Sequence, residues 1–422
     1  MLYINRIHCV SKPNNLMEDA LTNCKDLSWD HYSFLDEGIR AVNKNNAGRV
    51  KGQKAIQNVS AQGGLASVFQ GGNPNVSFLL PIGGANQLDV CTSMILELTI
   101  LNNDGANAAT LLAGQALLTN IITMTGNNIE NSQFENQLVR RLYSSSADEE
   151  LFQRATLEYF SYAGYPAAYT TSATTIAAGG STKVYLQIFT PFDCTQCFLP
   201  AITTQITVQC YFNATGMTST SLASSISLTD ARLIMHGIKY QNNIRAALLN
   251  KFAAKPHIYA YYAGQREILS GVSVSAANEQ NFQVSAMSGF NLAALWLGVR
   301  AANASQEDLY TFESILTVDE RINGTSVYNS KLNKQEFSAM AMDNNIQTSV
   351  PNGNTNLIML PHSVDVYQSL KWGKLRGYQL YNPNVNILLQ MSSVTGNRDL
   401  VAIGLAASVI IIDKGTVRLE YL

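Results

Sequence analysis

Two cysteines, Cys194 and Cys197, have the spacing in this sequence best suited to chemistry. Two thiols separated by two residues can bind zinc or exchange a disulfide. A structural zinc site needs four ligands, and neither a second Cys-x-x-Cys pair nor a His-x3-His pair follows. A redox pair is activated at the amino end of a helix, whereas the flanking residues predict a loop between two strands. The pattern favours incidental loop cysteines, with a redox or metal site as the alternative.

Other catalytic signatures are missing from the sequence. The Gly-Gly-Ser-Thr-Lys stretch at 179–183 is glycine-rich, but its lysine follows the hydroxyl residues and no spaced upstream glycine completes a phosphate-binding loop. The acidic run 148–150 is best explained as the first turn of a helix, where the macrodipole favours negative charge. Dispersed histidines suggest no metal pair, although a cluster in space stays open: His8, His31, His236, His257 and His362.

Tryptophans could form a platform for binding a sugar ring. Trp296 and Trp372 lie in strand-like runs, so packing in a core or an interface is the favoured interpretation. We therefore predict that the protein is not an enzyme. We predict no catalytic, cofactor-binding or metal-binding residues, and no cofactor.

The composition indicates a globular chain that is poor in charge. Of 422 residues, 46% are apolar and 14% are charged, and the formal net charge is −2. The length allows two domains, each with its own core. Asn, Gln, Ser and Thr must supply most of the polar surface, which suits short strands joined by polar loops. Direct nucleic-acid binding is not expected, because no basic tail or dense Lys/Arg run is present.

The start of the chain and the cysteines predict a cytoplasmic site of synthesis. The apolar run 1–4 is broken at once by Asn5, so no secretory signal is expected. The apolar run 400–412 is too short to span a bilayer. We expect six free thiols in a reducing cytoplasm, at Cys9, Cys24, Cys91, Cys194, Cys197 and Cys210.

Alternating apolar residues predict strands in the first half of the chain, because successive side chains in a strand point to opposite faces. Residues 1–74 show no sustained periodicity and are expected to form an arm. The expected strands are 75–82, 94–100, 117–124, 183–188, 205–210 and 231–240. One helix is expected from Ser146, where Glu149 completes a capping box, and it ends near Gly164 and Pro166.

The second half repeats this order. An amphipathic connector at 242–255 places Ile244, Leu248 and Phe252 on one side. Asn323-Gly324 predicts a type I′ hairpin turn, and a helix is expected near 330–343. The expected strands are 257–264, 282–286, 295–299, 356–360, 385–389, 401–412 and 417–421.

Strands, a helix and further strands in each half indicate a duplicated all-β domain. Many short strands with Gly/Asn turns are typical of sandwiches and barrels. We predict two consecutive eight-stranded jelly rolls, a double jelly roll, with short accessory helices. The expected division is an arm 1–74, a first roll 75–241, a connector 242–255 and a second roll 256–422.

Two segments of the first half carry a family resemblance. Residues 98–124 resemble the early strands of the double jelly-roll major capsid proteins of the tectivirus/adenovirus lineage. Residues 173–191 do so too, with an Ala/Gly-rich turn leading into a strand that ends near a proline. The resemblance covers about a third of the chain and is carried by strand patterns without an invariant signature.

The resemblance implies a shell subunit. Such proteins stand two rolls perpendicular to the capsid surface, form pseudo-hexagonal trimers and tile an icosahedral shell, commonly over an internal membrane. The implied partners are two further copies, neighbouring capsomers, penton and minor capsid proteins, and a membrane contacted by the arm. The implied location is the virion capsid, after synthesis in the host cytoplasm.

Two other classes of protein stay open at this point. A receptor-binding spike, or another β-rich adhesion protein, shares the Asn/Thr-rich strands, although no fibrous repeat is present. A carbohydrate-active enzyme or a cupin-like jelly roll would need an acid/base pair or a histidine cluster that the sequence does not display.

Overall fold

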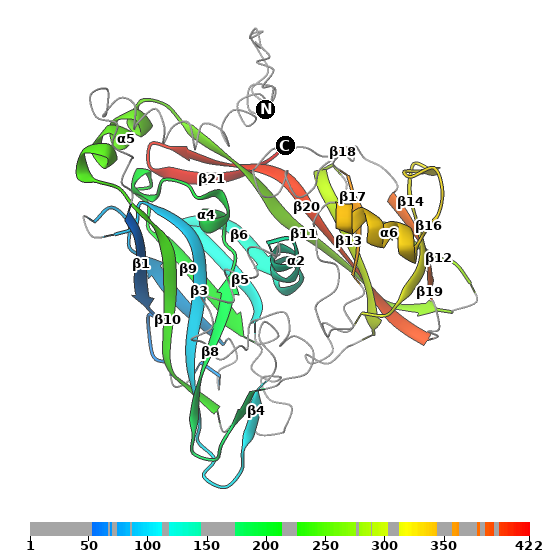
Figure 1. The fold of residues 1–422 in the computed structure, drawn as a ribbon, viewed down its shortest axis with the longest axis horizontal. Coiled ribbons are helices and arrows are strands. Elements are labelled where there is room, and N and C mark those ends of the chain that lie inside the picture. The colour runs from blue at the N-terminus through cyan, green and yellow to red at the C-terminus, as the bar shows by residue number, and fades with distance from the viewer. Residues whose placement is uncertain are drawn as a thin grey trace.

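Four β-sheets, arranged as two facing pairs, form the fold of the computed structural model (Figure 1). The structure describes residues 53–65, 68–69, 74–84, 87–111, 118–144, 174–212, 226–275, 278–287, 289–302, 312–343, 357–362, 378–379, 385–391 and 396–422. The predicted helix at 146–164 and Trp372 lie outside these residues, as do Cys9, Cys24, His8 and His31.

The first roll consists of two four-stranded antiparallel sheets. In order across sheet A the strands are β1 (Gln53–Ser60), β10 (Ile226–Lys239), β3 (Val90–Asn102) and β8 (Ser181–Ile188). In order across sheet B they are β2 (Asn75–Leu80), β9 (Ile206–Phe212), β5 (Leu118–Thr125) and β6 (Asn127–Gln133). The first strand pairs with the last in sheet A, and the second with the second-to-last in sheet B, which is a jelly-roll order.

The second roll repeats that order with new strands. Sheet D contains β11 (His257–Val274), β20 (Gly396–Asp413), β13 (Asn291–Ala301) and β17 (Ile358–Pro361), with β18 (Tyr378–Gln379) and β21 (Thr416–Tyr421) paired at its side. Sheet E contains β12 (Gln280–Val284), β19 (Val385–Met391), β14 (Ile315–Ile322) and β15 (Thr325–Ser326), with β16 (Leu332–Asn333) also paired to β14. The predicted double jelly roll is confirmed.

Smaller elements connect the rolls and their loops. A two-stranded ribbon, sheet C, joins β4 (Ala109–Leu111) to β7 (Thr174–Ile176). The helices are α2 (Phe134–Ser144), α4 (Pro191–Thr195), the 3-10 turn η3 (Leu199–Ala201), α5 (Asn242–Ala254) and α6 (Lys334–Asp343). Among the described residues, none of the helices is long and apolar enough to cross a membrane.

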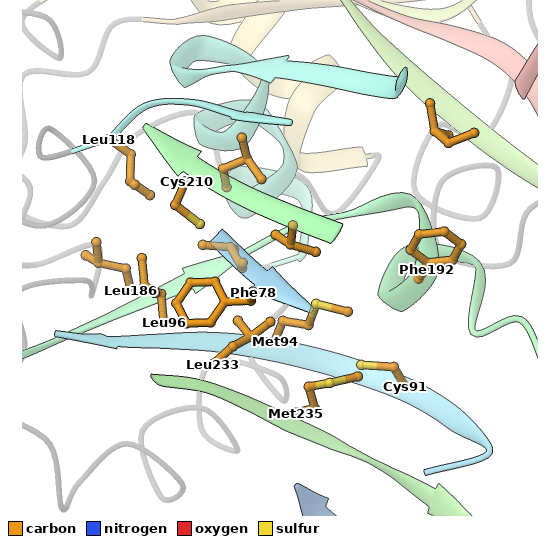
Figure 2. Packing of buried hydrophobic residues seen from close by; sticks show 14 of the residues in the cluster. Phe78, Cys91, Met94, Leu96, Leu118, Leu186, Phe192, Cys210, Leu233 and Met235 are labelled. Atoms are coloured by element: carbon orange, nitrogen blue, oxygen red, sulfur yellow. The ribbon is translucent and has the colours of Figure 1, made fainter. Parts of the chain in front are cut away.

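The alternating apolar residues form the core of the first roll, as expected. The inward residues of sheet A, among them Leu96, Leu186 and Leu233, face Phe78 of sheet B (Figure 2). All four side chains are fully buried. Burying a side chain of this size contributes about 1.5–3 kcal/mol, so the inward side chains of the alternating strands stabilise this sandwich.

The predicted turn and helices of the second half are confirmed. Arg321 pairs with Ser326 around Asn323 and Gly324, whose φ angles are 52° and 83°. Two positive φ angles in a two-residue loop define the type I′ turn. Helix α6 lies within the expected 330–343. Helix α5 lies within the expected connector, with its buried residues at Ile244, Leu248 and Phe252.

Two expectations about the first half need correction. Gln53–Ser60 forms β1, which pairs with β10 along its whole length inside the stretch expected to be an arm without strands. Helix α2 follows β6 directly, where no helix was expected. The reason is the same in both cases: polar residues occupy inward positions and hide the apolar period. Gln57 faces inward in β1, and its Oε1 accepts a hydrogen bond from the backbone N–H of Leu88 at 3.1 Å.

Candidate functional site

The contact between the two rolls, here called the seam, contains a network of buried polar side chains. It lies between α2 and β6 of the first roll and β11, β13 and β20 of the second (Figure 1). The outer face of sheet D closes it. Trp296, Val401, Ile403 and Leu405 on that face belong to the same apolar cluster as the first roll. Alternate residues of the same strands belong to the separate core of the second roll.

One half of the polar seam is built around Arg140 of α2. Its Nη2 lies 3.0 Å from Glu130 Oε1 and donates to Tyr261 Oη at 2.6 Å and to the backbone oxygen of Tyr262 at 2.8 Å. Tyr261 Oη in turn donates to Glu130 Oε2 at 2.6 Å. The Arg140 and Glu130 side chains are 1% and 5% exposed. Burial raises the pKa of the Tyr261 hydroxyl well above its usual range, so it stays a hydrogen-bond donor.

The other half is built around Glu135 at the start of α2. Its two carboxylate oxygens bind Arg266 of β11 at 2.7 Å and Arg300 of β13 at 3.2 Å. Gly264 of β11 lies against the same turn, since a Cβ at this position would be 2.5 Å from Cγ of Asn136. The backbone of β11 therefore approaches α2 as closely as it can only because residue 264 is glycine.

A hairpin of the second roll makes one further contact with the first roll. Strands β20 and β21 turn through Lys414 and Gly415, at φ angles of 49° and 84°. The Gly415 carbonyl accepts backbone hydrogen bonds from Thr203 at 2.9 Å and from Thr204 at 3.3 Å in the first roll. The second roll is thus attached to the first both by side chains and by backbone.

Charged groups in this position are costly unless they are paired. A buried ion pair rarely stabilises a fold more than apolar residues of the same volume would, but removing one partner leaves an uncompensated charge. The pairs instead fix the relative orientation of the two rolls, because each carboxylate finds its hydrogen-bond partners at only one orientation. The seam therefore fixes the relative orientation of the two rolls.

The Cys-x-x-Cys pair lies next to the seam, in the connection between β8 and β9, with Cys194 in the short helix α4 and Cys197 just after it. Thr190 caps α4: its side chain accepts the N–H of Phe192, and its backbone N–H donates to Asp193 Oδ1 at 2.7 Å. Cys194 sits at the carboxyl end of this helix, where the dipole opposes a thiolate. Burial raises the pKa of Cys197 to about 12. This setting does not activate a redox pair.

The remaining sequence candidates are the cysteines, the histidines and the tryptophans. Cys91, Cys194, Cys197 and Cys210 are free thiols. Within the described part of the chain, no three His, Cys, Asp or Glu residues are grouped to hold a metal ion. Trp296 is fully buried in the seam, as packing predicted. His362 Nε2 lies 2.9 Å from Glu320 Oε1 inside the second roll.

Sequence reasoning missed every charged residue of the seam. The signal available was a charge inside an apolar strand, as at Arg300, which follows the buried run 292–299. Sequence patterns treat such a residue as the end of a strand. They cannot reveal that a carboxylate from α2 meets it across 165 positions of the chain.

Comparisons with known proteins agree with this architecture. No protein-family model matches the chain, and no curated protein matches it. Among solved structures, VP54 of PBCV-1 is similar at 14% identity and a TM-score of 0.60, over 90% of this chain and 99% of that one. The Faustovirus major capsid protein is similar at 10% identity and a TM-score of 0.52, over 94% and 98%. The mavirus major capsid protein is similar at 11% identity and a TM-score of 0.50, over 90% and 93%.

These identities are low, so the likeness concerns the fold. It extends over nearly the whole length of both chains in each case, and therefore includes both rolls and not one alone. This chain has the double jelly-roll fold that these viral capsid proteins also have.

Proposed function

We propose that this protein is a major capsid protein, the subunit that forms the shell of an icosahedral virus. The observation that supports it best is the likeness, over nearly the full chain, to the major capsid proteins of Faustovirus and mavirus. A fold alone can host several functions. The seam adds support, because a shell subunit needs two rolls held at one fixed orientation.

In this proposal three copies assemble into a capsomer with a pseudo-hexagonal outline. Each chain contributes two rolls of the same strand order, so a trimer has six similar lobes. A ring of this kind is closed by a heterologous contact, in which each copy uses two different surfaces. The role is structural and involves no catalysis.

The further partners follow from the same role. They are neighbouring capsomers, penton and minor capsid proteins, and an internal membrane, with the segment before β1 as the part that reaches toward the membrane. The virion capsid is the proposed location. We propose the chain division 75–241, 242–255 and 256–422 for the two rolls and their connector, with β1 as an additional strand of the first roll.

Sedimentation velocity of the purified protein, with electron microscopy of the same sample, tests this function. The expected result is a trimer that persists in high salt and has six lobes in projection. A monomer that stays monomeric at micromolar concentration would count against a shell subunit. A receptor-binding spike, the alternative from sequence, would instead be present at few copies in a particle.

A further inference from the structure

The two cysteines of the Cys-x-x-Cys motif lie in different surroundings. Cys194 is exposed, and its Sγ accepts a hydrogen bond from Arg140 Nη1 at 3.5 Å at the edge of the seam. Cys197 follows Gln196, whose left-handed conformation ends α4. Its side chain is fully buried in the core cluster of the first roll. Nearness in sequence therefore does not make Cys194 the natural partner of Cys197.

A third cysteine, Cys91 near the start of β3, lies opposite Cys197. After α4 the chain returns to β3, where Val90 pairs with Phe198 in an antiparallel bridge. A backbone hydrogen bond of 2.9 Å beside this bridge joins the same two segments. In an antiparallel pair, the residue after one partner lies opposite the residue before the other. The bridge therefore places Cys91 across from Cys197.

The side chains of Cys91 and Cys197 also point to the same side. Successive side chains along extended backbone alternate in direction, so both cysteines point away from the side that Val90 and Phe198 occupy. Phe198 packs on Phe252 of α5, with ring centroids 5.0 Å apart. The two cysteines point the other way, into the core, and each is 0% exposed. Figure 2 shows Cys91 among the side chains of this core.

The spacing of the two backbones suits a covalent link between these thiols. Residues directly opposite each other in an antiparallel pair have Cα atoms about 4.5–5.5 Å apart. A disulfide joins residues whose Cα atoms are about 4.4–6.8 Å apart. A bond between the sulfurs of Cys91 and Cys197 therefore requires no large movement of either segment.

We propose that Cys91 and Cys197 form a disulfide when the protein passes from reducing to oxidising conditions. The oxidant is a low-molecular-weight disulfide, such as oxidised glutathione. One protein thiolate attacks it, forms a mixed disulfide and releases one glutathione thiolate; the second protein thiolate then displaces the other. Both protein sulfurs are oxidised, two glutathione molecules are reduced, and the two thiol protons pass to the glutathione thiolates.

This link is independent of the function proposed above and differs from a catalytic redox pair. It joins β3 to the connection that carries α4, and α4 contacts β11 of the second roll. In the same connection the Phe198 N–H donates to Tyr259 Oη of β11 at 3.4 Å. The disulfide closes a long loop, from 91 to 197, and such closure restricts the unfolded chain. The link therefore stabilises the first roll beside the seam.

The native thiols are expected to react slowly, because the thiolate is the attacking species. Burial, with a smaller contribution from the Asp193 carboxylate, raises the pKa of the Cys91 thiol well above its usual range. Burial likewise raises the pKa of Cys197 to about 12. Oxidation is therefore best tested during refolding, while both thiols are still accessible to the solvent.

Refolding of the full chain from urea, in a buffer of reduced and oxidised glutathione, tests the link. Digestion and tandem mass spectrometry then identify the joined peptides. The expected product joins the peptide that contains Cys91 to the one that contains Cys194 and Cys197. The Cys194→Ala variant is expected to keep this link, which assigns it to Cys197. Cys210→Ala is the matched control, because it removes another fully buried thiol of the same core.

Thermal melting gives a second measurement. The oxidised wild type is expected to melt about 2–5 °C above the reduced protein. Cys194→Ala and Cys210→Ala should retain this difference. Cys91→Ala and Cys197→Ala should each melt at one temperature in both buffers, because neither can form the link.

Three results would overturn the proposed pairing. The first is a wild type that stays fully reduced after refolding in excess oxidised glutathione. The second is a disulfide between Cys194 and Cys197 in its place. The third is a melting temperature that still depends on oxidation in Cys91→Ala. Mapping of the wild type requires no variant, so the test holds even where an alanine variant does not fold.

Discussion

Sheets A and D have the same strand order but strands of different amino-acid composition. Strand β20 of sheet D is buried from Leu400 to Ile412, whereas its equivalent in sheet A, β10, alternates between buried and accessible residues over 231–239. A strand covered on both faces becomes a continuous apolar run, and one covered on a single face alternates. The difference teaches that the contact between the rolls, and not the jelly-roll order, determines which strands are apolar throughout.

The charges differ in the same way. Glu130 and Arg140 form an almost fully buried pair in the seam, while Asp230 and Arg232 form an accessible pair on sheet A. Buried pairs are costly to break and exposed pairs contribute little. The contrast between the buried pair and the accessible pair therefore predicts losses of stability of different size for equivalent substitutions.

Removing Arg140 is expected to have the largest effect. Arg140→Ala leaves Glu130 buried without its cation and should lower the free energy of unfolding by about 3–5 kcal/mol. Urea denaturation followed by tryptophan fluorescence and circular dichroism measures this loss. Arg232→Ala on sheet A is the matched control and should lower it by no more than about 1 kcal/mol. Equal losses for the two variants would contradict the distinction between the buried pair in the seam and the accessible pair on sheet A.

Adding a methyl group where β11 meets α2 is expected to have an intermediate effect. Gly264→Ala places a Cβ against Asn136 and should lower the free energy of unfolding by about 1–3 kcal/mol, as overpacking does. Asn136→Ala combined with Gly264→Ala should recover part of the loss. Gly105→Ala is the control, since a Cβ there meets nothing within 4 Å. A Gly264→Ala variant as stable as this control would mean that α2 does not lie against β11.

A third effect depends on pH and concerns Asp193 beside the seam. Burial raises the pKa of Asp193 to about 7, although hydrogen bonds from Thr190 and the charge of Arg140 oppose the shift. A raised pKa in the folded state means stability that is full below the unfolded value near 4 and is lost as pH rises through 7. The loss should not exceed about 1.4 kcal/mol per pH unit.

Asp193→Asn removes this titration. Its urea midpoint should change less between pH 5 and pH 8 than that of the wild type. A wild-type midpoint that rises over this range, with the same rise in the variant, would show that Asp193 is ionised throughout.

Much of the fold could be predicted because alternation reports burial directly. Strands such as β8 and β9 have one solvent-accessible face and one buried face. Their expected bounds differ from the observed ones by two residues or fewer. Strand β1 could not be found this way, because Ile56 points outward while Gln57 points inward. Its apolar residues lie on both faces, so the pattern has no period of two.

The seam could not be predicted for a related reason. Helix α2 buries Glu135, Asn136 and Gln137, residue types that a sequence pattern assigns to a solvated surface. The burial of Glu135 depends on partners that lie more than a hundred residues away, Arg266 and Arg300. Only the three-dimensional contact of the two rolls explains why such a residue is buried.

A reconstruction of the purified oligomer by electron microscopy, at a resolution that separates helices from sheets, tests the central claim most directly. The shell function predicts three copies in a ring of six lobes. It also predicts the same relative orientation of lobes within a copy and between copies. An oligomer with twofold symmetry would contradict it.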